Sequence, residues 1–100
     1  MTKVYRSEMD FQGIPCALVL MFTETGRFDA FRLDPQITLG GWAEMTLRRT
    51  CHIFTRNIRA CLRSGISAAT MAAECPEGTP EKTILSAIAL VDANPDGVAQ

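Results

Sequence analysis

The stretch LRRTCHIFTRNIRACLRSGIS, residues 47–67, interleaves apolar and basic residues in a regular order. Its apolar members recur mostly at spacings of three and four, which is the period of an α-helix with one buried face. They are Leu47, Cys51, Phe54, Ile58, Cys61 and Leu62. Gly65 follows at a position where a left-handed glycine commonly ends a helix. The pattern predicts one long helix over about residues 42–64.

Basic residues form a second stripe on the same predicted helix. Arg49, His52, Arg56, Arg59 and Arg63 are also spaced by three and four, and they fall opposite the apolar stripe. Residues 45–73 contain five arginines and no Asp or Glu, a charge of +5, whereas the remainder of the chain carries −6. The slightly acidic chain therefore concentrates positive charge on one helix face.

A helix face that serves solubility alone usually mixes charges of both signs, because like charges three or four residues apart repel. Arginine in place of lysine at all five positions favours two-pronged contact with carboxylate or phosphate. Three interpretations remain open: ion pairs within the chain or between subunits, an anionic small ligand or protein partner, and nucleic acid. The acidic remainder of the chain and the lack of interleaved exposed aromatic residues count against nucleic acid. We expect the following residues to contact a partner or an anion: Arg48, Arg49, His52, Arg56, Arg59 and Arg63.

The first third of the chain predicts an antiparallel sheet. The segments KVYRSEM (3–9), CALVLMFT (16–23) and RFDAFRL (27–33) are rich in β-favouring residues, and turn residues separate them. Short connections with Gly13 and Gly26 are typical of hairpins. We therefore expect three consecutive antiparallel strands.

The middle strand does not alternate between apolar and polar residues, as a sheet with one solvated face should. Both of its faces are apolar, and Phe28 and Phe31 of the next strand are expected on opposite faces. We therefore expect both faces of the sheet to be covered, the second one by another copy of the chain in a homodimer. The alternative is a thin satellite core of small residues on the second face.

Two shorter helices complete the predicted fold. Ser67 is a suitable cap for a helix over AATMAAE, residues 68–74, and Pro80 opens a last helix that extends to about Val91. Residues 93–100 are expected to form a frayed tail. The fold class is α+β, with a three-stranded antiparallel sheet, one long helix and two shorter helices packed in two layers as a single domain over residues 1–92.

No catalytic or metal-binding constellation is evident. Four cysteines lack the closely paired spacing of a zinc site, and three of them fall in predicted core positions, leaving Cys75 as the accessible thiol. His52 is the sole histidine and lies among arginines, so a nucleophile with a histidine base is not expected. We therefore expect no catalytic residue, metal or cofactor, and favour a protein that is not an enzyme.

The cellular location is predicted from the start of the chain and from its apolar runs. MTKVYRSEMD lacks the apolar core of a signal peptide, and the longest apolar run, residues 14–22, is too short to span a bilayer as a helix. We expect a cytoplasmic protein with no membrane contact and with reduced thiols.

The order of elements resembles that of the TSCPD-type domain. The resemblance rests on GRFDAF (26–31), on a glycine-containing turn before a long helix that closes in LRSGIS (62–67), and on a loop with proline and an acid before the last helix. That family occurs as a small standalone protein and at the C-terminal end of vitamin B12-dependent ribonucleotide reductases. Its Thr-Ser-Cys-Pro-Asp motif is associated with metal binding. The corresponding place here is Gly78-Thr79-Pro80-Glu81, with Thr79 where the cysteine would be.

The resemblance implies an α+β fold and a link to ribonucleotide reduction, without the metal ligands. We therefore expect a non-catalytic accessory or interaction domain whose arginine-rich helix face contacts an acidic partner, such as a reductase subunit, or an anionic ligand. A small nucleic-acid-binding protein and a purely structural homodimer are the alternatives.

Overall fold

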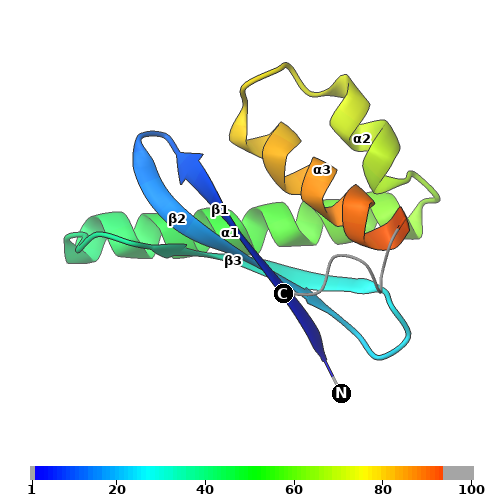
Figure 1. Ribbon diagram of the computed structural model, residues 1–100, viewed down its shortest axis with the longest axis horizontal. Helices are drawn as coiled ribbons and strands as arrows, with labels where there is room; N and C mark the ends of the chain where they lie inside the picture. The colour runs from blue at the N-terminus through cyan, green and yellow to red at the C-terminus, as the bar shows by residue number, and fades with distance from the viewer. Residues whose placement is uncertain (1, 94–100) are drawn as a thin grey trace.

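The computed structural model describes residues 2–93. Three strands precede three helices: β1 (Lys3–Phe11), β2 (Ile14–Phe22), β3 (Phe28–Pro35), α1 (Gly41–Arg63), α2 (Ala68–Glu74) and α3 (Pro80–Ala93). The strands form one antiparallel sheet in the order β1-β2-β3. Figure 1 shows α1 running along the sheet and α2 and α3 forming a helical hairpin above it. The α+β class and the order of elements predicted from the sequence are confirmed.

The β1–β2 hairpin has a two-residue turn. Phe11 pairs with Ile14, and the intervening Gln12 and Gly13 have φ values of 52° and 86°. Two positive φ angles define the type I′ turn, whose twist matches that of the flanking strands. The Asp10 carboxylate accepts a hydrogen bond from the Gly13 N–H at 2.9 Å and supports the turn.

A β-bulge corrects the prediction for the two phenylalanines of β3. Phe28 pairs with Phe22 and Phe31 pairs with Leu20, with a register shift between Met21 and Phe22. The shift leaves one extra residue in β3, which returns both rings to the same face. The expectation that Phe28 and Phe31 lie on opposite faces is therefore wrong.

The core lies between one face of the sheet and the three helices. Leu18 and Phe22 of β2 are fully buried in one hydrophobic cluster that also contains Ile58 of α1 and Ile84 and Ile88 of α3. Edge-to-face ring contacts continue the packing. They are Tyr5–Phe22 at 5.6 Å, Phe22–Phe28 at 5.9 Å and Phe31–Phe54 at 5.7 Å between ring centroids.

The other face of the sheet carries charged residues on its outer strands. The cross-strand row Arg6–Val19–Arg32 adjoins the row Glu8–Ala17–Asp34. Val19 is 1% exposed although no described helix covers this face, because its neighbours in the row carry long side chains. That a second copy of the chain covers this face of the sheet remains a prediction.

The outer edge of β3 is closed by side chains of α1. The backbone N–H of Phe31 donates to Thr55 Oγ1 at 3.4 Å, and the Cys51 thiol lies beside the backbone of Leu33. Covering an edge in this way blocks further strand pairing there. Helix α1 is consequently fixed alongside β3 with its opposite face turned outward.

The three helices begin and end close to the predicted residues. Ser67 caps α2 by accepting a hydrogen bond from the Thr70 N–H, and Gly65 ends α1 with a φ of 90°. The predicted frayed tail, residues 93–100, begins inside α3, which extends to Ala93, and its remaining residues lie outside the described range. Within that range, no helix combines the length and apolarity needed to cross a membrane.

Candidate functional site: the outward face of helix α1

Helix α1 is one unbroken helix of 23 residues with two different faces. Leu47, Cys51, Thr55 and Ile58 are buried toward the sheet. All six residues that the sequence indicated for partner or anion contact are exposed. They are Arg48, Arg49, His52, Arg56, Arg59 and Arg63. The helix therefore presents its basic residues to the outside, as its periodicity predicted.

The six residues do not form a single site. Arg48 and His52 line a groove of about 370 Å³ between α1 and β3, together with Arg32 and Asp34. This groove follows the edge of β3, and its floor includes Phe31 and Leu33. The N-terminal half of the basic stripe thus borders the sheet.

Arg59 and Arg63 line a second hollow near the end of α1. This hollow measures about 630 Å³ and also includes Arg27 of the β2–β3 hairpin and Asp92 of α3. Asp92 is exposed, but partial desolvation by its surroundings raises the pKa of its carboxyl above the ordinary value. Three arginines from two elements therefore surround an open hollow with a carboxyl group at its border.

Arg49 and Arg56 line neither hollow and point away from the sheet. At about 100° per residue they lie within roughly 20° of each other around the helix axis, opposite the buried face. They are the centre of the surface that we call the arginine face, which consists of Trp42, Met45, Arg49, Ile53, Arg56 and Arg63.

Ion pairing within the chain accounts for little of this positive charge. Arg59 Nη1 lies 3.9 Å from Asp29 Oδ1, with both side chains about half exposed. For residues 2–93, this is the one ion pair formed by an arginine of α1. A pair of that length and exposure contributes little to stability, so ion pairs within residues 2–93 do not account for the five arginines.

Large apolar side chains are exposed among the arginines. Trp42 is 76% exposed, Met45 51% and Ile53 50%. Met45 and Ile53 were not predicted from the sequence as surface residues of interest, although both lie off the apolar stripe of α1. Trp, Met and Arg are the residue types enriched at protein–protein interfaces, and Lys and Glu are depleted there.

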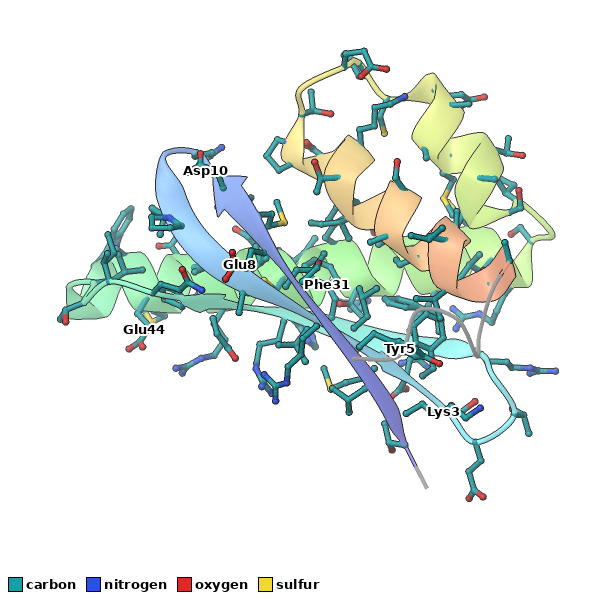
Figure 2. All side chains as sticks on the ribbon, viewed as in Figure 1. Lys3, Tyr5, Glu8, Asp10, Phe31 and Glu44 are labelled. Atoms are coloured by element: carbon teal, nitrogen blue, oxygen red, sulfur yellow. The ribbon has the colours of Figure 1, made fainter. Side chains whose placement is uncertain are left out.

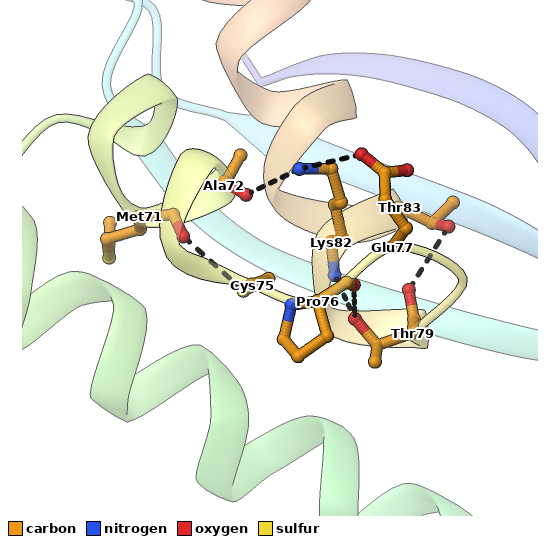
Figure 3. Close-up of polar contacts among 8 residues, drawn as sticks. All are labelled: Met71, Ala72, Cys75, Pro76, Glu77, Thr79, Lys82 and Thr83. Carbon is orange, nitrogen blue, oxygen red and sulfur yellow. Dashed lines mark hydrogen bonds and ion pairs between the residues drawn. The ribbon is translucent and has the colours of Figure 1, made fainter.

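The loop between α2 and α3 corresponds to the motif position of the resemblance (Figure 3). Thr79 Oγ1 donates to the Pro76 carbonyl at 2.8 Å and accepts from the Lys82 N–H at 3.3 Å, so it caps α3. Lys82 Nζ donates to the Ala72 carbonyl at 3.0 Å and lies 3.4 Å from Glu77 Oε1. Residues 76–82 therefore use their polar groups to hold the two helices together.

The thiols and acids do not assemble into a reactive or metal-binding group. Cys16 and Cys51 are buried, and burial raises the pKa of both thiols, which keeps them protonated and unreactive. Cys75 is partly buried and donates to the Met71 carbonyl at 3.3 Å. Among the residues that the structure describes, no three His, Cys, Asp or Glu side chains are placed to hold a metal ion.

Comparison of the chain with protein-family models, with curated proteins and with solved structures yields no match. The resemblance to TSCPD-type domains therefore stays an expectation from the sequence.

Proposed function

We propose that the chain is a non-catalytic accessory domain that docks an acidic protein surface through the arginine face of α1. The observation that carries this proposal is the exposure of five arginines on one helix, of which Arg59 alone forms an ion pair among residues 2–93. Like charges on one helix destabilise it slightly, and an acidic partner offsets that repulsion. Docking is the function for which this arrangement is best suited.

The exposed apolar side chains of the arginine face favour a protein as the partner. Trp42, Met45 and Ile53 are each at least half exposed, and burial of such side chains against a partner supplies the hydrophobic part of binding. The surface is the convex side of a helix, so it fits a groove on another protein better than it encloses a small anion. The charges then determine which partner is accepted and how fast it associates.

The resemblance to TSCPD-type domains suggests the identity of the partner. We propose an acidic surface of a B12-dependent ribonucleotide reductase, in the cytoplasm. Since Thr79 caps a helix where the family motif has cysteine, the proposed role is docking and not metal binding.

The experiment compares two double variants of the full chain for binding to the purified reductase from the same organism. Arg49→Glu/Arg56→Glu reverses the charge at the centre of the arginine face, and Arg49→Lys/Arg56→Lys keeps the charge but removes the planar guanidinium. We expect the charge reversal to weaken binding by about 100-fold or more and the lysine variant by about tenfold.

The same titration is repeated with a single-stranded DNA 20-mer in place of the reductase. If the charge reversal leaves binding to the reductase unchanged, the arginine face is not the docking surface. Absence of reductase binding overturns the assignment of the partner. Salt-sensitive DNA binding in place of reductase binding overturns the choice of a protein partner and favours nucleic acid.

A further inference from the structure

Among residues 2–93, the sheet has one covered edge and one edge to which no strand or helix pairs. Thr55 and Cys51 of α1 close the outer edge of β3, whereas no described element pairs with the outer edge of β1. Figure 1 looks onto β1, with β2, β3 and α1 behind it. Strand β1 has nine residues and contains no proline, glycine or bulge. A long regular edge of this kind is a template for pairing with another chain.

The hairpin geometry determines which backbone groups of β1 face outward. Phe11 and Ile14 flank a two-residue turn, so they form a hydrogen-bonded pair, and such pairs recur at every second residue. The odd-numbered residues of β1 therefore direct their N–H and C=O groups toward β2. The even-numbered residues, Val4, Arg6, Glu8 and Asp10, direct theirs outward.

The hydrogen bonds of the neighbouring strands agree with this alternation. Gln36 N donates to the Pro15 carbonyl at 2.8 Å, so odd-numbered residues of β2 face β3. By the same alternation, the backbone N–H and C=O of Phe31 point away from β2, and this N–H donates to Thr55 Oγ1. Four residues of β1 are thus left with outward backbone donors and acceptors.

We propose that β1 pairs in antiparallel orientation with β1 of a second copy of this chain, in the register centred on Ser7. In this register Arg6 lies opposite Glu8 of the second copy, and Glu8 lies opposite its Arg6. Because both residues direct their backbone groups outward, each such pair exchanges two hydrogen bonds. Tyr5 then lies opposite Met9 of the second copy on the face that the helices cover.

Charge selects this register over its neighbours. Centring the pair on Arg6 would place two arginines opposite each other, and centring it on Glu8 would place two glutamates opposite each other, which is destabilising. The register on Ser7 pairs all nine residues and forms two Arg–Glu pairs. Charged residues normally protect an edge strand from self-association, but the order of the charges in β1 is self-complementary.

The residues at the centre of the proposed contact are accessible. Figure 2 shows Lys3, Tyr5, Glu8 and Asp10 spread along β1, the strand nearest the viewer. Arg6, Ser7 and Glu8 are all exposed, so the centre of the proposed contact is accessible. Pairing would produce a six-stranded antiparallel sheet with the helices of both copies on the same face.

A charge swap tests the register by sedimentation velocity of the full chain over a range of concentrations. Arg6→Glu and Glu8→Arg, made singly, convert two attractive pairs into two repulsive ones, and each is expected to raise the dimer dissociation constant by about tenfold or more. Arg6→Glu/Glu8→Arg in one chain restores both pairs and is expected to restore the dimer. Failure of the double variant to recover the loss overturns the register.

A cysteine at the proposed two-fold axis separates edge pairing from stacking through the uncovered sheet face. Ser7 lies on the helix-covered side of β1, so Ser7→Cys is expected to form a disulfide-linked dimer on mild oxidation under edge pairing and not under face stacking. The wild-type chain and Ser86→Cys, an exposed serine of α3, are the matched controls.

Two outcomes overturn the proposal. One is a wild-type chain that stays monomeric at all concentrations, and the other is crosslinking that is no faster in Ser7→Cys than in the controls. Neither outcome affects the docking proposal for α1. Arg49 and Arg56 lie on α1, which packs along β3 at the opposite edge of the sheet from β1.

Discussion

At the scale of single residues, Thr55 joins the long helix to the sheet. It is a buried polar residue in a helix face that otherwise buries apolar groups, and its hydroxyl accepts the outward N–H of Phe31 at 3.4 Å. Without this acceptor, a buried backbone donor at the edge of β3 would lose its partner. The role of Thr55 could not be predicted from the sequence, because a threonine beside the apolar and basic stripes gives no signal of a partner 24 residues away.

Replacing this hydroxyl tests its role in stability. Thr55→Val keeps the shape of the side chain but leaves the Phe31 N–H unpaired, and we expect it to lower the free energy of unfolding by about 1 kcal/mol. Thr55→Ser keeps the hydroxyl and is the matched control for the lost bond. Urea denaturation measures both variants, and a valine variant as stable as wild type would show that the hydrogen bond contributes nothing net.

At the scale of elements, the end of α1 depends on backbone conformation. Gly65 has a φ of 90°, and Ile66 N donates to the Cys61 carbonyl in the manner of a Schellman motif. A Cβ added at Gly65 would meet no atom within 4 Å, so the cost of a side chain there is conformational and not steric. Gly41 begins the same helix and has equal space around it, but its φ is not positive.

These two glycines form a matched pair for mutation. We expect Gly65→Ala to lower the free energy of unfolding by about 1 kcal/mol, because alanine is strained at positive φ. Gly41→Ala is expected to raise it by about 0.5 kcal/mol, because alanine restricts the unfolded chain and suits a helix. Thermal or urea unfolding distinguishes the two, and equal effects of the same sign would contradict this account.

The elements also show what could be predicted from the sequence. The bounds of α1 and α2 follow from periodicity and from local caps, so they were predicted to within a residue. The bulge in β3 was not, because a single extra residue changes the face of Phe28 without any change in the local pattern. The exposure of the arginines was predictable for the same reason as the helix, but their division between two hollows depends on where β3 and the hairpin lie.

At the scale of the whole molecule, the two proposed contacts lie toward opposite edges of the sheet, because α1 packs along β3 and β1 is the other outer strand. The lateral order is β1, β2, β3 and then α1, so pairing through β1 leaves α1 of each copy at the far ends of the assembly. A dimer of this kind would present two arginine faces at once. If the partner also has two docking surfaces, the second contact forms within the complex and increases affinity without any new residue.

The separation of charge across the molecule makes a prediction about stability. Arg56 is followed by Arg59 three residues later and forms no ion pair within residues 2–93, so its charge opposes folding slightly. We expect Arg56→Glu to raise the free energy of unfolding by about 0.5 kcal/mol at low salt and by less at high salt, because it replaces a repulsion with an attraction that salt screens.

Arg32→Glu is the control, because Arg32 Nε pairs with Asp34 Oδ1 at 2.8 Å and its reversal should destabilise the fold. Denaturation at two salt concentrations measures both variants. A destabilising Arg56→Glu would mean that the arginines serve the fold, whereas a stabilising one that also abolishes docking would mean that they are retained for a partner.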